Sequence, residues 1–74
     1  MDYTIRLKEL RDDYQYKQIA IAQYLYVGQH TYSDYETGKI RIPVEHLIRL
    51  AKLYNVSMDY ICGVTKYKKE FPLE

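Results

Sequence analysis

A chain of 74 residues has room for one domain, and a domain of this size hides only about 60% of its unfolded surface. One cysteine excludes an internal disulfide, and Cys62 with His30 and His46 does not make a metal-ligand set, so we expect no cofactor. The formal net charge of +1 gives no general attraction to nucleic acid, and no apolar run approaches the roughly 18 residues that span a bilayer, so we expect a cytoplasmic protein without membrane contact.

Apolar residues at helical spacing predict the first two helices. One runs from about Thr4 to Asp13, and the next runs from Gln18 to Leu25. The residues expected to face the core are Tyr3, Leu7, Leu10 and Tyr14 in the first helix, and Ile21, Ala22 and Leu25 in the second.

A third helix is predicted from Gln29 to Glu36, and Gly38 is well placed to end it in a left-handed conformation. Its two faces differ in chemistry. The residues expected to face inward are Val27, Tyr32 and Tyr35. The polar residues expected on the outer face are Gln29, His30, Ser33 and Asp34, with Thr31 at the margin. No core needs such a face, so it is a candidate binding surface.

The second half of the chain predicts two more helices. Pro43 suits the start of a helix from Val44 to Tyr54, whose inner face is Val44, Leu47, Leu50, Ala51 and Tyr54. Ser57 is a good N-cap for a short helix from Met58 to Cys62, with Gly63 as its exit. No segment alternates like a strand, so we predict an all-α domain over residues 1–63. Residues 64–74 are expected to form a polar, mobile tail, and Leu73 and Glu74 are consistent with a tag scar.

Taken in order, these features resemble the Cro/repressor-type (Xre-like) helix-turn-helix domain of phage and bacterial regulators. The resemblance runs from about Leu7 to Gly63. The matching pieces are Leu10-Arg11, Gln18, Ala22, Leu25, Tyr35-Glu36-Thr37-Gly38-Lys39, Leu50-Ala51-Lys52 and Asn55-Val56-Ser57. The resemblance implies a five-helix, lambda-repressor-like fold whose third helix lies in the major groove of DNA.

The same resemblance implies that Gln29, His30 and Asp34 meet base edges, with Thr31 and Ser33 beside them. The chemistry of the outer face agrees, because Gln can bond adenine through two hydrogen bonds, His can donate to guanine and Asp can accept from cytosine. Phosphates repel a carboxylate, however. Asp34 is therefore also a candidate for orienting His30, which lies four residues earlier on the same face.

Contacts to the DNA backbone are expected at both ends of the helix-turn-helix. The resemblance places Gln18 against a phosphate, at a helix N-terminus whose free N–H groups favour an anion. The other residues expected to contact the backbone are Lys17, Thr37, Lys39 and Arg41. Residues 38–74 carry seven Lys and Arg against four Asp and Glu, which makes this half locally basic. Arg11 and Glu36 match a structural ion pair of the family.

Two residues depart from the family pattern in the turn between the second and third helices. Tyr26 stands where Gly is usual, and Gly28 stands where Ser or Thr is usual. If the family backbone is kept, Tyr26 adopts a positive φ at a cost of roughly 1–2 kcal/mol. Gly28 gives up the side-chain hydrogen bond of an N-cap.

We therefore predict a sequence-specific DNA-binding transcriptional regulator, a repressor, that binds a double-stranded operator as a weak two-fold homodimer. The expected dimer surface is Tyr54, Met58 and Tyr60, flanked by Tyr67 and Phe71. No nucleophile–base pair, Gly-rich phosphate loop or metal spacing indicates an enzyme, and nothing indicates a small-molecule ligand. The alternative is a protein-interaction module, such as the antitoxin half of a toxin–antitoxin pair, which would have no use for a polar outer face on the third helix.

Overall fold

The computed structural model describes residues 2–72, and all regular structure in this range is helical. The helices are α1 (Tyr3–Asp13), α2 (Gln18–Leu25), α3 (Gln29–Thr37), α4 (Val44–Tyr54) and α5 (Met58–Ile61). The predicted all-α class is confirmed, and every predicted helix agrees to within one residue at each end. None of these helices is long and apolar enough to cross a membrane. The suggested tag origin of Leu73 and Glu74 concerns residues outside the described range.

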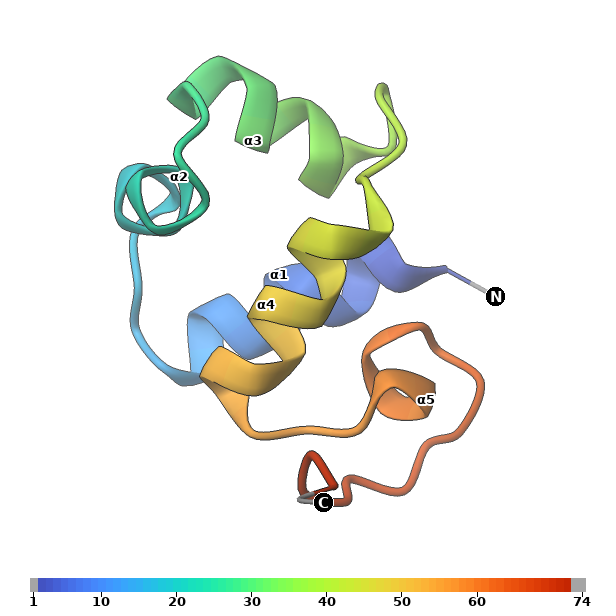
Figure 1. Cartoon of the computed structure of the whole chain (residues 1–74). Helices are drawn as coiled ribbons and strands as arrows, with labels where there is room; N and C mark the ends of the chain where they lie inside the picture. Colours follow the sequence, from blue (N-terminus) through green and yellow to red (C-terminus); the bar gives the residue numbers. More distant parts are fainter. Residues whose placement is uncertain (1, 73–74) are drawn as a thin grey trace.

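The two ends of the molecule carry different helices. In Figure 1, α2 and α3 lie at one end, and α5 with the segment that follows it lies at the other. α3 packs against α1 and α2, while α5 packs against α1 and α4. Buried apolar residues from all five helices form one core: Leu7, Leu10, Ile21, Ala22, Leu25, Tyr32, Tyr35, Ile42, Leu47, Leu50, Ala51, Tyr54, Val56 and Ile61. The core therefore anchors α3 from one side only.

Tyrosine takes the place of aliphatic residues in the largest core positions. Tyr32 and Tyr54 are the two largest side chains that are completely buried. Burial raises the pKa of both phenols, because an ionised phenolate would lose its hydration there. Both rings therefore stay neutral and act as large apolar groups.

Helix ends follow the cues in the sequence. The Ser57 hydroxyl accepts a hydrogen bond from the N–H of Tyr60 at 3.1 Å, which confirms it as the N-cap of α5. Gly38 ends α3 at φ 81°, and Asn55 ends α4 at φ 54°. Tyr26 ends α2 at φ 59°, which confirms the predicted left-handed conformation at a residue that carries a Cβ.

Two residues of the predicted inner stripes are exposed. The prediction for Val44 is wrong: it is 56% exposed, and Ile42 from the preceding extended segment fills the core instead. Val44 is the first residue of α4, so it lies at the edge of the core rather than over it. Tyr14 follows the last residue of α1 and is partly exposed, and its hydroxyl donates to the carbonyl of Tyr54 at 2.8 Å. Tyr14 therefore covers one end of the core with its ring and hydroxyl without being fully buried.

Residues 64–72, which are expected to form a polar, mobile tail, fold back on the segment that joins α4 and α5. The N–H of Ser57 donates to the carbonyl of Lys69 at 2.8 Å, and the N–H of Phe71 donates to Asn55 Oδ1 at 3.2 Å. The ammonium group of Lys52 lies 5.6 Å from the centre of the Phe71 ring, and Phe71 packs against the core. The Phe71 ring and these hydrogen bonds together hold the segment against the core.

Candidate nucleic-acid interface

α3 has one apolar face and one polar face, as its sequence predicts. Tyr32 and Tyr35 are buried, with their ring planes at 88° and their centres 6.4 Å apart, and Val27 packs beside them. Edge-to-face rings at this distance attract each other. Close packing thus fixes the inner face. The outer face is therefore not needed to hold the helix against the core.

The outer face begins at the first residue of α3. Gln29 and His30 are exposed, whereas Thr31 and Ser33 are only partly exposed. The expectation that Asp34 points outward is wrong: its side chain is 12% exposed, against 87% for His30. Its carboxylate lies 3.6 Å from His30 Nε2, four residues earlier. Asp34 is turned under the imidazole, so the alternative role of orienting His30 agrees with the geometry better than a direct base contact.

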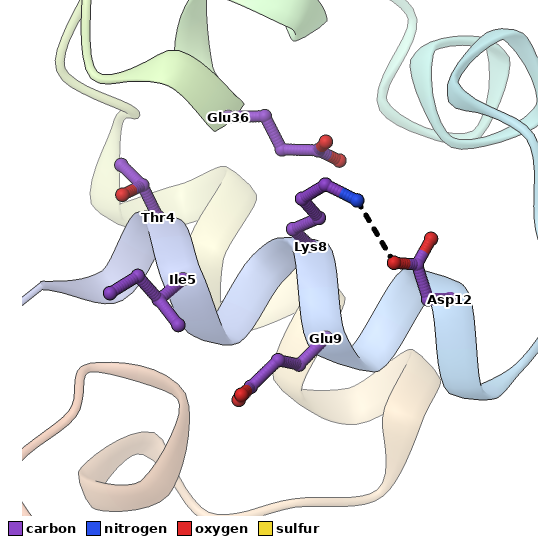
Figure 2. A pocket seen from close by; sticks show the side chains of 6 residues that line it. All are labelled: Thr4, Ile5, Lys8, Glu9, Asp12 and Glu36. Carbon is purple, nitrogen blue, oxygen red and sulfur yellow. Dashed lines mark hydrogen bonds and ion pairs between the residues drawn. The ribbon is translucent and has the colours of Figure 1, made fainter.

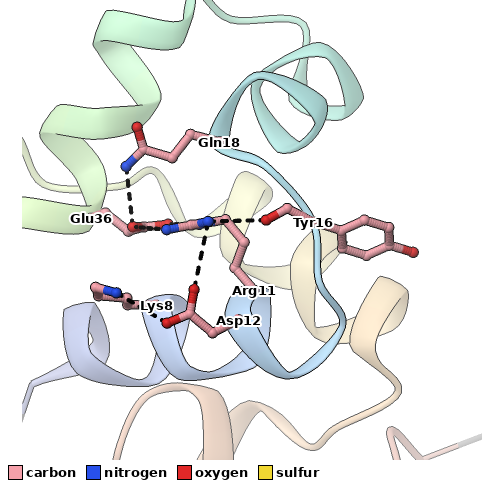
Figure 3. A network of polar contacts seen from close by, with 6 residues as sticks. All are labelled: Lys8, Arg11, Asp12, Tyr16, Gln18 and Glu36. Atoms are coloured by element: carbon pink, nitrogen blue, oxygen red, sulfur yellow. Dashed lines mark hydrogen bonds and ion pairs between the residues drawn. The ribbon is translucent and has the colours of Figure 1, made fainter.

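A network of charged and polar groups ties α3 to α1 and α2 from below (Figure 3). Arg11 donates from Nε to Glu36 Oε2 at 2.6 Å and from Nη2 to Oε1 at 3.0 Å, and Arg11 Nη1 donates to the carbonyl of Tyr16 at 3.0 Å. The Arg11 and Glu36 side chains are only 13% and 4% exposed. The expected ion pair is therefore present, in the two-bond geometry that makes Arg–carboxylate pairs strong.

The protonation of this network is set by competition between burial and bonding. Burial alone would raise the pKa of Glu36, but interactions with Arg11, Tyr32 and Gln18 outweigh it and hold the pKa below its ordinary value. The hydrogen bonds to Glu36 likewise raise the pKa of Arg11. Both groups stay charged near neutral pH, so the pair holds the C-terminal end of α3 in place.

Gln18 belongs to this network. Its side-chain amide nitrogen donates to Glu36 Oε1 at 3.2 Å, so the side chain bridges the start of α2 and the end of α3. It remains the first residue of α2, and the preceding Lys17 is exposed and gives α2 no side-chain cap. The backbone N–H groups at this end therefore stay available to an anion, whichever way the Gln18 side chain turns.

The segment after α3 carries the remaining residues expected at a DNA backbone. Thr37, Lys39 and Arg41 are all exposed, and the Thr37 hydroxyl also donates to the carbonyl of Asp34 at 3.3 Å. The phenol oxygen of Tyr3 accepts from the N–H of Ile42 at 3.0 Å and so fixes the end of this segment. Sequence reasoning missed this role for Tyr3, because no local pattern links residues 39 positions apart.

One residue expected on the dimer surface is not on a surface. Tyr54 is 1% exposed, so its assignment is wrong. It is the last inner residue of α4, and the rings of Tyr14 and Tyr16 pack over it with centres 5.1 and 6.3 Å away. Met58 and Tyr60 are partly exposed and pack against the core with their remaining surface.

A shallow depression of about 330 Å³ lies along α1 below the end of α3 (Figure 2). Its lining residues are Thr4, Ile5, Lys8, Glu9, Asp12 and Glu36. The ammonium group of Lys8 is already bound to Asp12 at 3.0 Å. The other two carboxylates that line the depression are also paired with bases, because Glu9 lies 3.5 Å from Arg6 and Glu36 binds Arg11.

Comparison with known proteins agrees with this geometry. A family model described as Helix-turn-helix matches residues 7–61, which include all of α2, α3, α4 and α5 and most of α1. The match therefore covers the Arg11–Glu36 pair and the whole outer face of α3.

Three relatives from Bacillus subtilis are described as HTH-type transcriptional regulators. ImmR is 37% identical over 65 residues, which are 88% of this chain and 51% of ImmR. YobD, described as uncharacterized, is 35% identical over 63 residues, which are 85% of this chain and 56% of YobD. AnsR is 34% identical over 67 residues, which are 90% of this chain and 58% of AnsR. The chain thus spans a little over half the length of these relatives.

A solved structure is similar over almost the whole chain. The crystal structure of a transcriptional regulator from Listeria innocua superposes with a TM-score of 0.80 at 29% identity, covering 99% of this chain and 65% of that one. The proteins of this family act by binding DNA and are not enzymes. From the family match and the relatives together, the chain belongs to the Xre-like helix-turn-helix family of DNA-binding transcriptional regulators.

Proposed function

We propose that this protein is a repressor that reads operator DNA by placing α3 in the major groove. The observation that carries the proposal is the pair Gln29 and His30, which are exposed at the first turn of a helix whose opposite face is buried. The start of a helix can enter the groove end-on and reach base edges. The relatives' descriptions as transcriptional regulators agree with this role.

Base recognition rests on two side chains and their supports. Gln29 can donate to N7 and accept from N6 of one adenine, and His30 can donate to an acceptor of guanine. The carboxylate of Asp34 lies 3.6 Å from His30 Nε2 and is the acidic group beside the imidazole. Thr31 and Ser33 are only partly exposed, so they contribute shape at the edges of the contact. Gln29 thus supplies most of the discrimination.

Contacts to the phosphates lie on either side of α3. The free N–H groups at Gln18 and the exposed Lys17 stand at the start of α2. Thr37, Lys39 and Arg41 follow the end of α3, in a segment that Tyr3 holds in place. These contacts fix the register of α3 in the groove and carry no sequence information themselves.

A single α3 reads too few base pairs to find one site in a genome, so we propose that two copies bind a palindromic operator as a two-fold dimer. The surface we assign to the dimer is Met58, Tyr60 and the exposed Tyr67, without the buried Tyr54. The dimer is weak and forms mostly on DNA. Occupation of the operator then blocks access of polymerase to the promoter.

The proposal is tested by selecting bound duplexes from a randomised DNA library at moderate salt. The wild-type protein should enrich a palindrome, and the double variant Gln29→Ala/His30→Ala should lose or change it. Because both side chains are exposed, the double variant should melt at the wild-type temperature. Gln23→Ala, which removes an exposed glutamine from α2, is the matched control and should select the wild-type palindrome.

Two results would contradict the proposal. The first is no enrichment by a folded wild-type protein, which would favour a protein-interaction module such as an antitoxin and make a partner search the next step. The second is an unchanged selected sequence for the double variant, which would move base reading away from the start of α3.

A further inference from the structure

The turn between α2 and α3 carries a side chain that the fold does not need. Tyr26 ends α2 at φ 59°, where a residue with a Cβ costs roughly 1–2 kcal/mol and glycine costs much less. Its ring is 86% exposed, so burial gives nothing in return for the strain. Backbone strain that packing does not offset is often found at functional positions.

Arg49 on α4 holds this turn. Its Nη2 donates to the carbonyl of Tyr24 at 2.9 Å, and the hydroxyl of Tyr24 lies 3.4 Å from the carbonyl of Arg49. The guanidinium carbon lies 5.1 Å from the centre of the Tyr24 ring and 5.5 Å from the centre of the Tyr26 ring. Within cation–π distance of two rings, the charge is fixed in position. We call Tyr24, Tyr26 and Arg49 the turn cluster.

A purely structural role explains only part of the turn cluster. The bond from Arg49 to the carbonyl of Tyr24 caps the end of α2, which is a sufficient reason for that pair. It does not explain the exposed ring of Tyr26. It also does not explain why Arg49 forms no ion pair within residues 2–72, in a chain with almost as many acidic as basic residues.

The turn cluster lies next to the proposed reading end of α3. Tyr26 precedes Gln29 by three residues, which can span at most about 11 Å of chain. The N-cap of α3 is Gly28, which makes no side-chain hydrogen bond, so the N–H groups at this end add further positive potential. Arg49, which has no ion pair within residues 2–72, and the exposed Tyr26 therefore lie at the turn that leads directly into the uncapped N-terminus of α3.

We propose that the turn cluster binds a DNA backbone phosphate beside the half-site, with Arg49 as the cation and Tyr26 as a hydroxyl donor. The proposal rests on the proposed function, because it assumes that Gln29 and His30 enter the groove. It gives the start of α3 an anchor that matches Lys39 and Arg41 beyond its end. The strained backbone conformation of Tyr26 is then retained because it places the Tyr26 ring beside the phosphate.

The test measures operator affinity over a range of salt concentrations for Tyr26→Gly and Arg49→Gln. Each should weaken binding by about tenfold, as for loss of a charged hydrogen bond. Arg49→Gln should also reduce the slope of log affinity against log salt by about 0.9, the value for one released counterion. Arg49→Lys should keep the slope, and Lys68→Gln, in the exposed segment at the opposite end of the molecule, is the charge-matched control.

Thermal unfolding separates the two roles of the turn. Tyr26→Gly relieves the strain at φ 59°, so it should melt at or above the wild-type temperature while binding DNA more weakly. A structural role alone would lower the melting temperature and leave the affinity of the folded protein unchanged. Opposite signs in the two measurements support the proposal, whereas a lower melting temperature with wild-type affinity overturns it.

Failure of this proposal differs from failure of the proposed function. If Gln29→Ala abolishes operator binding while Tyr26→Gly and Arg49→Gln leave affinity and salt slope unchanged, the turn cluster is structural and the proposed function stands. If affinity falls and the salt slope of Arg49→Gln stays at the wild-type value, the contact is not with a phosphate and the proposal is also overturned. If the folded wild-type protein binds no duplex, both proposals fail together.

Discussion

The two faces of α3 differ in how firmly their side chains are held. On the inner face every residue is held by several neighbours: Tyr32 and Tyr35 by the core, and Glu36 by Arg11 and Gln18. On the outer face Gln29 and His30 are exposed, and within residues 2–72 the only charged partner of His30 is Asp34 on the same helix. A helix can present its exposed side chains to a partner in a fixed position only when many contacts hold its buried face. The inner face is therefore the condition for the function of the outer one.

The same contrast appears between two side-chain pairs of α3. Arg11–Glu36 joins distant elements, is almost completely buried and has two short hydrogen bonds. His30–Asp34 joins neighbours one turn apart, has a longer separation and leaves the imidazole in solvent. Breaking the buried pair leaves a charge without its partner away from water, whereas loss of the His30–Asp34 contact leaves His30 hydrated. Substitutions at the two pairs should therefore affect different properties.

The largest effect is expected on the inner face. Arg11→Ala leaves the Glu36 carboxylate buried without its partner, so the free energy of unfolding should fall by about 3–5 kcal/mol. Urea unfolding measures this directly. Lys8→Ala on the same helix is the matched control, because it breaks the exposed pair with Asp12 and should cost only about 0–1 kcal/mol. Equal losses for the two variants would show that the Arg11–Glu36 pair has no special structural role.

Lowering the pH should weaken the stabilisation by the Arg11–Glu36 pair, with a smaller effect on stability than Arg11→Ala. Since the pKa of Glu36 is lower in the folded protein than its ordinary value of 4.5, the folded state binds that proton less readily than the unfolded chain. The resulting stability is fully present above pH about 4.5 and is lost as the pH falls through the folded pKa. Melting temperatures from pH 7 to pH 3 should fall more steeply for the wild type than for Glu36→Gln. Parallel curves would contradict the lowered pKa.

Sequence predicted the inner face well because its information is local. Stripes of apolar residues gave the five helices, Ser57 and Gly38 marked helix ends, and the resemblance supplied the Arg11–Glu36 pair and the left-handed Tyr26. Each of these rests on spacing within one helix or on a family pattern. Such patterns can be read from the sequence without knowing how the helices pack against one another.

The errors concern residues at the edges of elements. The helical pattern predicts Asp34 on the outer face, yet its side chain is turned inward. The expected dimer surface includes Tyr54, although the same kind of pattern places it on the inner face of its helix, where it is buried. Phe71 docks a segment that composition marks as a free tail, and Arg49 reaches the turn before α3 from another helix. Such contacts depend on tertiary packing, which a single sequence does not show. They are also where the outer surface acquires features beyond the family pattern.

The smallest stability effect, and the sharpest test of the contrast between the faces, is expected from Asp34→Asn. The contact between Asp34 and His30 is long, at 3.6 Å, and joins residues one turn apart, where such pairs contribute only about 0.2–0.5 kcal/mol, so the melting temperature should change little. Asparagine keeps a polar group of the same size beside the imidazole but removes its negative charge. Discrimination at the base that faces His30 should therefore weaken, while discrimination at the base that faces Gln29 is retained. Affinities for operators with single base substitutions measure both, with Ser33→Ala as the neighbouring control. If Asp34→Asn instead unfolds the protein as readily as Arg11→Ala, then Asp34 belongs to the inner face, and the division of α3 into a structural and a reading face has to be redrawn.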